Sequence, residues 1–250
     1  MKVGAQFYTV RDFCKNLDDF SETLKKIADI GYTTVHISGV CDFEPEWLAE
    51  ELKKNGLSCP LTHIAPDELK GDMQALVKKH DVLDCKHVGL GYINFEDGKE
   101  KEILEKLISD YKPVAKGLRE GGKYFMYHNH DMEFKKVDGK LILDHIAEAF
   151  SPDEAGFTVD TYWVQVGGGD PAAWIEKLSG RVPCIHLKDC AFGRQMAPVG
   201  EGNINFDRVF KAAEAAGTEY MFVEQDNCNG ENPFDCLKRS YCNLRSYGFR

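Results

Sequence analysis

The sequence has no long apolar run, no paired cysteine motif and no excess of positive charge. None of its apolar segments approaches the roughly 20 residues that a membrane-spanning helix needs. Its nine cysteines are scattered without a Cys-x-x-Cys pair, which argues against a disulfide framework and a cysteine zinc site. The formal net charge is −10, from 41 acidic residues against 31 lysines and arginines, which disfavours nucleic acid as a partner.

Further absences bear on location and on domain organisation. Met1 and Lys2 lead directly into strand-like sequence, so we expect no secretory signal and no membrane partner. An odd number of unpaired cysteines is typical of a reducing compartment, so we expect a cytoplasmic protein. No linker or low-complexity segment interrupts the chain, which predicts one domain over residues 1–250. The oligomeric state is left open, and a homo-oligomer is compatible with the sequence.

What the sequence does contain is a regular alternation of short apolar segments and amphipathic segments. The short apolar segments predict strands, and apolar residues three and four apart predict helices between them. Strands are expected at 3–8, 34–38, 57–63, 87–92, within 123–134, and at 156–160, 182–188 and 220–224. Helices are expected at 17–30, 45–55, 66–83, 99–119, 141–150, 172–178, 206–216 and 233–247.

This alternation predicts an α/β fold, the (β/α)₈ TIM barrel. Eight strand–helix units in a chain of 250 residues match the size and count of that barrel. Short apolar strands are typical of parallel sheets that are covered on both faces. A doubly wound open sheet is the alternative. It has no positive support, because the first loop lacks the Gly-x-Gly-x-x-Gly segment that binds a dinucleotide.

The segment from Lys123 to Phe134, KYFMYHNHDMEF, changes abruptly from aromatic to polar. Residues two apart on a strand share a face, so His128 and His130 are expected to point the same way. A histidine alone is often a satisfied core residue. Two histidines, an asparagine and two acids within six residues indicate a functional site instead.

Polar residues of the same kind follow the later strands. Asp160 ends the sixth strand, His186 and Lys188 share a face of the seventh, and Glu224 ends the eighth. A loop cap at Asp160 or a surface acid at Glu224 would explain one residue, but not a run of consecutive strand ends. In a barrel these ends meet at one rim. Carboxylates and imidazoles without a thiolate predict one divalent metal ion there, Mn²⁺, Mg²⁺, Zn²⁺ or Fe²⁺.

Other residues at the expected rim carry weaker signals. His36 and His63 end the second and third strands. They are either site residues, with His63 in contact with the substrate, or ordinary core or loop histidines. Gly200–Gly202 has the pattern of a loop that cradles an anion with backbone N–H groups. Aromatic residues that would form either a wall for a sugar ring or ordinary core are Tyr8, Tyr92, Trp163 and Phe192.

The chain resembles the xylose isomerase-like TIM barrels, the sugar phosphate isomerase/epimerase group that also includes inosose dehydratases and apurinic endonucleases. The matching segments span nearly the whole chain and are Gly4–Arg11, Tyr127–Phe134, Asp160–Pro171, His186–Asp189, Val199–Gly202 and Glu224. The resemblance implies one divalent metal ion held by residues at the ends of strands five to eight. Asp160, His186 and Glu224 fall on three of these ligand positions.

The fourth ligand position departs from the family's pattern. Many relatives carry Glu-Asn-His where this chain has His128-Asn129-His130, so the ligand from strand five is either His128 or Glu133. Epimerases of the group resemble one another in using two metal-linked carboxylates, which remove and return a proton next to a metal-bound carbonyl. Glu224 matches one of these bases. Its partner in proton transfer would be His130, Lys188 or Glu133.

The leading interpretation is therefore a metal-dependent isomerase or epimerase that acts on a small-molecule sugar or sugar phosphate. The alternative is a lyase that dehydrates a keto-sugar or keto-inositol, which needs one acid and one base rather than two equivalent carboxylates. A phosphodiesterase of the apurinic endonuclease type would need a multi-zinc cluster and a basic face, which the sequence does not provide. A sugar-binding barrel without metal or activity is a further interpretation, and metal analysis separates it from the others.

Overall fold

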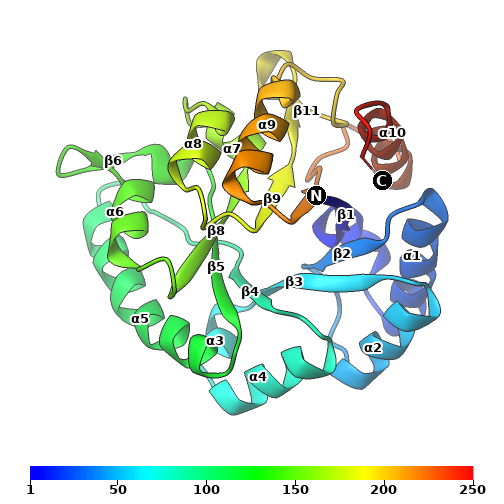
Figure 1. Ribbon diagram of the computed structural model, residues 1–250, viewed down its shortest axis with the longest axis horizontal. Coiled ribbons are helices and arrows are strands. Elements are labelled where there is room, and N and C mark those ends of the chain that lie inside the picture. Colours follow the sequence, from blue (N-terminus) through cyan, green and yellow to red (C-terminus); the bar gives the residue numbers. More distant parts are fainter. Residues whose placement is uncertain (250) are drawn as a thin grey trace.

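The computed structural model describes residues 1–249 and contains a closed barrel of eight parallel strands, in the order β1-β12-β9-β8-β5-β4-β3-β2 (Figure 1). The predicted (β/α)₈ barrel is confirmed, with β1 closing the ring against β12. The barrel strands are β1 (Lys2–Gln6), β2 (Thr34–Ile37), β3 (Ser58–Ile64), β4 (His87–Leu90), β5 (Tyr124–His128), β8 (Ala155–Asp160), β9 (Cys184–Leu187) and β12 (Tyr220–Val223).

The helices lie around the outside of the barrel (Figure 1), and local sequence sets their ends. Asn16 caps the first helix by accepting a hydrogen bond from the Asp19 N–H (3.0 Å), and Gly217 ends the ninth with a left-handed conformation (φ 78°). Over residues 1–249, no helix has the length and apolar character to cross a membrane. The helices are α1 (Leu17–Ile30), α2 (Pro45–Lys54), α3 (Pro66–Leu69), α4 (Met73–Val82), α5 (Glu100–Glu120), α6 (Ile142–Ala149), α7 (Thr161–Val166), α8 (Pro171–Lys177), α9 (Phe206–Ala216) and α10 (Pro233–Ser246).

Most expected boundaries shift by one or two residues, and two larger differences have a local cause. The single helix expected over 66–83 is two helices, because the Asp72 side chain accepts hydrogen bonds from the Gln74 and Ala75 N–H groups and starts α4. The first strand ends at Gln6, whose side chain accepts from the Tyr8 N–H and begins a 3₁₀ turn. The sequence did not predict the helix α7 or the three 3₁₀ turns, η1 (Phe7–Phe13), η2 (Met132–Phe134) and η3 (Phe192–Arg194). It also did not predict two hairpins, β6 (Lys136–Val137) with β7 (Lys140–Leu141) and β10 (Asp189–Cys190) with β11 (Met196–Ala197).

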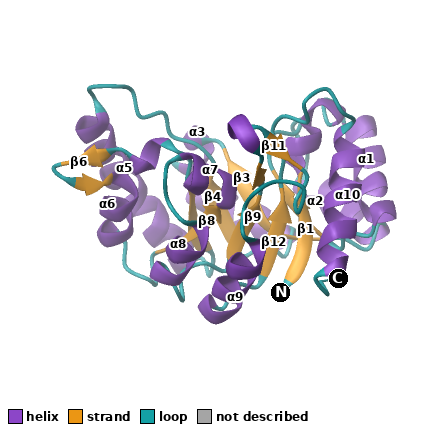
Figure 2. Ribbon diagram, turned by 90° about the horizontal axis from the view of Figure 1, so that it is seen from above, coloured by secondary structure: helices purple, strands orange, loops and turns teal. Residues whose placement is uncertain are grey.

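The barrel interior consists of two layers of side chains. Leu61, Met126, Cys184 and Phe222 are fully buried and form one apolar cluster toward the N-terminal ends of the strands. Side chains two residues apart on a strand point to the same side. The next side chain that points into the barrel, two residues toward the C-terminal end, is polar on each of these strands: His63, His128, His186 and Glu224. The second view shows the strands enclosed between helices on both sides (Figure 2). The apolar layer thus supports a polar layer at the C-terminal end, where barrel enzymes carry their sites.

Candidate active site

A cavity of about 820 Å³ opens over the polar layer, a volume within the usual range for small-molecule sites. Residues from all eight barrel strands, or from the segments that directly follow them, line it. Among them are eight of the residues singled out from the sequence: Tyr8, His63, Tyr92, His128, His130, Trp163, Lys188 and Glu224. Asp160 and His186 are fully buried and lie outside this lining, in contact with His128, Lys188 and Glu224.

Four predicted ligands come together at this end of the barrel: His128, Asp160, His186 and Glu224. They sit on or just after β5, β8, β9 and β12, which are neighbours in the barrel. Each offers one donor atom, the four atoms lie within 4.8 Å of one another, and all four residues are buried. We call these residues the carboxylate–histidine group.

The hydrogen bonds of His128 leave one of its ring nitrogens free for a cation. Nδ1 lies 2.9 Å from the Gly91 carbonyl oxygen, which assigns the ring hydrogen to Nδ1. Nε2 then presents a lone pair to Asp160 Oδ2 at 3.3 Å. Burial, together with His186, lowers the pKa of His128 and keeps the ring neutral. Two acceptors that face each other in this way favour a cation between them, and a backbone carbonyl on the far nitrogen is usual for a histidine ligand.

His186 faces both carboxylates with a nitrogen that has no hydrogen-bond partner among the described residues. Its Nδ1 lies 2.9 Å from Glu224 Oε2 and 3.6 Å from Asp160 Oδ2, without the alignment of a hydrogen bond. Burial alone would lower the pKa of His186, but Glu224 and Asp160 outweigh burial and raise that pKa to about 9. The two carboxylates therefore make this spot one where positive charge is favoured.

One oxygen of each carboxylate accepts a hydrogen bond that fixes the side chain, and the other oxygen points toward the histidines of the group. Asp160 Oδ1 accepts from the Trp163 N–H (2.9 Å) and caps α7, so Oδ2 faces the histidines. Glu224 Oε1 accepts from Gln6 Nε2 (2.8 Å), so Oε2 faces His186. Gln6 is a site residue that the sequence analysis did not single out. It acts across 218 positions of sequence.

Lys188 is buried among three carboxylates. Its Nζ lies 2.8 Å from Asp226 Oδ2, 3.2 Å from Glu224 Oε2 and 3.4 Å from Asp160 Oδ2. Burial would lower the pKa of Lys188, but these carboxylates outweigh it, raise the pKa and keep the ammonium charged. Burial and the charge of Glu224 raise the pKa of Asp226 to about 7. Asp226 was missed in the sequence because it lies in the loop after β12, beyond the strand end.

Glu133 is buried, but it lies outside the carboxylate–histidine group. Its Oε1 accepts a hydrogen bond from the Tyr127 hydroxyl (2.6 Å) and its Oε2 accepts from the His130 N–H (2.9 Å). Both oxygens therefore hold the turn that follows β5. Of the two alternatives for the strand-five ligand, the structure brings His128 into the group.

His130 forms part of the cavity wall between two aromatic side chains. Its ring centroid lies 5.1 Å from that of Tyr92 and 5.2 Å from that of Trp163. Burial, with the charge of Lys188 adding to it, lowers the pKa of His130 to about 2, so the ring is neutral. Its Nδ1 is buried and has no hydrogen-bond partner among the described residues.

The loop Gly200–Gly202 cradles an anion, as its pattern suggested, but the anion belongs to the chain itself. The Gly200 and Gly202 N–H groups donate to Asp189 Oδ2 at 2.9 and 2.8 Å. The N–H groups of Cys190 (2.8 Å) and Ile204 (3.2 Å) donate to Asp189 Oδ1. The loop therefore anchors the segment directly after Lys188. Its N–H groups already donate to Asp189 and are not free to bind a substrate anion.

Comparisons with known proteins agree with this fold. Residues 24–238 match the family model of the xylose isomerase-like TIM barrel, and no curated protein matches the chain in sequence. A sugar phosphate isomerase/epimerase from Parabacteroides distasonis is 21% identical, with a TM-score of 0.84, covering 98% of this chain and 93% of its own. A D-psicose 3-epimerase from Clostridium cellulolyticum is 15% identical, with a TM-score of 0.70 and complete coverage of both chains. A probable 3-DHS dehydratase from Bacillus anthracis is also 15% identical, with a TM-score of 0.70, covering 98% of this chain and 99% of its own. The chain belongs to the xylose isomerase-like TIM barrel family.

Proposed function

We propose that this chain is an isomerase or epimerase that uses one divalent metal ion to act on a sugar. The observation that carries the proposal is the carboxylate–histidine group, whose four donor atoms converge next to a cavity of about 820 Å³. The printed names of two structural relatives, a sugar phosphate isomerase/epimerase and a D-psicose 3-epimerase, support this reaction class.

The residues of the group fit a divalent ion. His128 Nε2 and His186 Nδ1 offer nitrogens, and Asp160 Oδ2 and Glu224 Oε2 offer anionic oxygens. Such a mixed set suits Mn²⁺, Mg²⁺, Zn²⁺ or Fe²⁺. When bound, the ion supplies the positive charge that stabilises the oxyanion formed as a carbon beside a carbonyl loses its proton.

In this proposal Glu224 is the base and Lys188 is the acid. Burial alone would raise the pKa of Glu224, but Lys188 and His186 outweigh it and hold that pKa well below its usual range. Glu224 is therefore anionic and able to take a proton from carbon. Lys188 keeps its charge and lines the cavity, so its ammonium group is placed to give a proton to a substrate oxygen. His130, which burial keeps neutral, offers one hydrogen bond to a substrate hydroxyl instead of acting as an acid.

The charges around the cavity favour a free sugar over a sugar phosphate. Among the described residues that line it, Lys188 is the one lysine or arginine, and it already contacts three carboxylates. A phosphate group would therefore find no free cationic side chain in the described part of the cavity lining to pair with. Tyr8, Tyr92 and Trp163 supply the flat apolar walls that pack against the C–H faces of a sugar ring.

Dehydration of a keto-sugar or keto-inositol is the second candidate, and one observation favours it. The strand-five position holds His128, so Glu224 has no second carboxylate of the group on that strand as a partner. A charged Lys188 is better suited to protonating a departing hydroxyl than to returning a proton to carbon. The fold shared with a probable 3-DHS dehydratase supports this alternative.

A mass measurement in D₂O tests both candidates. Protein loaded with Mn²⁺ is incubated with a panel of free ketoses and keto-inositols, with the same ketoses as phosphates for comparison. Epimerisation returns a product of substrate mass plus one deuterium, whereas elimination releases water and yields a product that absorbs in the near ultraviolet. We expect turnover of free sugars that Glu224→Gln abolishes. Turnover that Glu224→Gln leaves intact would contradict the assignment of Glu224, and faster turnover of the phosphates would contradict the substrate class.

We also propose a cytoplasmic location. All nine cysteines are free thiols in the structure, which suits a reducing compartment. The expected result is a melting temperature that does not change when a thiol reductant is added. A large drop on reduction would contradict the proposal.

A further inference from the structure

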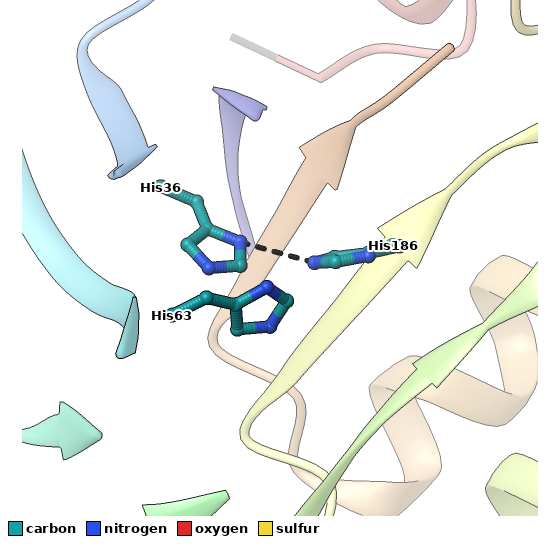
Figure 3. Close-up of side chains that lie close together, drawn as sticks. All are labelled: His36, His63 and His186. Carbon is teal, nitrogen blue, oxygen red and sulfur yellow. Dashed lines mark hydrogen bonds between the residues drawn. The ribbon is translucent and has the colours of Figure 1, made fainter. Parts of the chain in front are cut away.

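Three histidines, drawn in Figure 3, form a second cluster that shares His186 with the carboxylate–histidine group. His36 comes from β2, His63 from β3 and His186 from β9, and their side chains converge inside the barrel. Each offers one nitrogen within 4.8 Å of the other two. The ring centroids are 4.2 Å apart for His36 and His63, 5.1 Å for His36 and His186, and 5.6 Å for His63 and His186.

The spacing of the nitrogens is close to that of a tetrahedral metal site. With metal–nitrogen bonds of about 2.0–2.1 Å, two imidazole nitrogens on a tetrahedral ion lie about 3.3 Å apart. His36 Nδ1 and His186 Nε2 lie 3.0 Å apart. An ion therefore fits between them after a shift of a few tenths of an ångström, with one proton leaving the pair.

The cluster also offers an unpartnered nitrogen to an ion. His63 Nε2 is buried and has no hydrogen-bond partner among the described residues, and neither has His36 Nε2, the nitrogen that keeps the ring hydrogen when His36 Nδ1 binds the ion. Leaving a buried polar atom without a partner costs about 1–3 kcal/mol. The buried His80 shows the usual structural solution, since its Nδ1 lies 2.7 Å from the Leu76 carbonyl and its Nε2 lies 2.8 Å from Thr62 Oγ1. The clustered histidines differ, because His36, His63 and His186 each have one buried ring nitrogen without a hydrogen-bond partner among the described residues.

An ion at the cluster would have a route in and an open coordination position. His36 and His186 are fully buried, but His63 is half-buried and lines both the large cavity and a neighbouring cavity of about 310 Å³. Three protein nitrogens with a fourth side toward solvent is the usual arrangement of an open zinc site.

We propose that His36, His63 and His186 form a second metal site that takes a borderline ion, Zn²⁺ in preference to Mn²⁺ or Mg²⁺. Imidazole suits zinc, nickel and copper, whereas carboxylate-rich sites suit manganese and magnesium. With an ion on its Nε2, His186 carries its hydrogen on Nδ1, which faces Glu224 Oε2 at 2.9 Å. A carboxylate behind a histidine ligand orients the ring and increases its basicity.

The two sites compete, because they use opposite nitrogens of His186. The carboxylate–histidine group needs Nδ1, and the three-histidine site needs Nε2. A neutral imidazole has one lone-pair nitrogen, so His186 serves one ion at a time. Zn²⁺ in the three-histidine site thus withdraws His186 from the other group and weakens the binding of Mn²⁺ there. This inference concerns a separate ion and stands independently of the proposed reaction.

The test is a zinc titration of a variant that has lost half of the carboxylate–histidine group, Asp160→Asn with His128→Leu. Calorimetry should find one Zn²⁺ per chain, and Co²⁺ in its place should give the intense visible absorption of a tetrahedral ion. Adding His63→Ala should weaken Zn²⁺ binding on the order of 100-fold or more, because one of three protein ligands is lost. The matched control is His145→Ala. His145 lies on α6 and its Nε2 bonds to the Val137 carbonyl, so this substitution should leave Zn²⁺ binding unchanged.

Zinc binding that disappears in the double variant, or that survives His63→Ala unchanged, would overturn the second site. If the double variant does not fold, wild-type crystals soaked in Zn²⁺ give the answer through anomalous scattering at the zinc edge. A peak bonded to His36, His63 and His186 supports the site, and a peak that avoids His36 and His63 overturns it. The proposed isomerase is tested separately, by Mn²⁺ binding and by Glu224→Gln, so the two failures are distinguishable.

Discussion

The two ends of the barrel interior are built from the same strands but treat buried polar groups in opposite ways. At the N-terminal end, Met126 and Phe222 belong to a dry apolar layer, and the buried His87 bonds through Nδ1 to the Pro60 carbonyl at 3.0 Å. Two residues further along the strands, His63 and His186 lie in a polar layer, where His63 Nε2 and His186 Nδ1 are buried and have no hydrogen-bond partner among the described residues. The lower layer therefore supplies stability, and the upper layer gives up stability for binding.

Asp160→Asn should have the largest effect on the upper layer. Loss of a residue that hydrogen-bonds to a metal ligand typically lowers metal affinity by roughly 10–100-fold. Asp160 is itself a proposed ligand, so the Mn²⁺ affinity is expected to fall by more than that. Stability should fall only modestly, because asparagine caps α7 as well as aspartate does, while the buried Lys188 keeps two of its three carboxylates. Calorimetric titration and urea unfolding measure the two quantities. Unchanged Mn²⁺ affinity, or a large loss of stability, would contradict the comparison.

Met126→Ala should have the opposite signature in the lower layer. Met126 is fully buried, so its truncation leaves a cavity and is expected to lower the free energy of unfolding by about 2–5 kcal/mol. The Mn²⁺ affinity should change little, since the donor atoms lie one layer away. Met132→Ala is the matched control, because Met132 is half-buried at the cavity wall and should cost less. A large loss of Mn²⁺ affinity in Met126→Ala would show that the layers are not separable.

Acid should destabilise the fold in part through two structural histidines outside the polar layer, His80 and His87. Burial lowers the pKa values of His80 and His87 to about 4, against 6.5 in the unfolded chain. Between pH 6.5 and 4, each of these histidines is protonated in the unfolded chain but not in the folded one. The free energy of unfolding therefore falls by about 1.4 kcal/mol per pH unit for each histidine. Above pH 6.5 neither contributes. Urea unfolding at pH 7 and pH 5.5 should show a smaller drop for His80→Gln than for wild type, and an equal drop would refute the assignment.

Glu133→Gln should produce the smallest change. Glutamine keeps one acceptor oxygen for the Tyr127 hydroxyl or the His130 N–H and loses the other hydrogen bond, which is expected to cost about 1 kcal/mol. The Mn²⁺ affinity should be unchanged, whereas His128→Ala should reduce it strongly. Calorimetric titration of both variants measures this difference. A strong loss of affinity in Glu133→Gln would move the strand-five ligand from His128 to Glu133.

Local pattern was sufficient to predict the barrel and the residues at its strand ends. Alternation along a strand is a property of neighbouring residues, so His128, Asp160, His186 and Glu224 could be placed at one rim without coordinates. The position of Glu133 could not be predicted in this way. It depends on a tyrosine hydroxyl and a backbone N–H that capture its two oxygens, and several arrangements of a six-residue turn are compatible with the sequence.

Contacts between distant parts of the chain could not be predicted from local pattern at all. Gln6 reaches Glu224 because β1 closes the barrel against β12, and His36 meets His186 across 150 positions of sequence. The Gly200–Gly202 loop shows the same limit, since its pattern indicates an anion but not that the anion is Asp189. Such contacts follow from closure of the ring, which fixes which strand ends face each other.

The central claim is that His128, Asp160, His186 and Glu224 hold one divalent ion. Anomalous scattering from crystals grown with Mn²⁺ tests this claim most directly, because it locates the ion without reference to activity. The account predicts one strong peak at coordination distance from His128 Nε2, His186 Nδ1 and one oxygen each of Asp160 and Glu224. A peak bonded to Glu133 in place of His128, a peak elsewhere in the barrel, or no peak at saturating Mn²⁺ would contradict it.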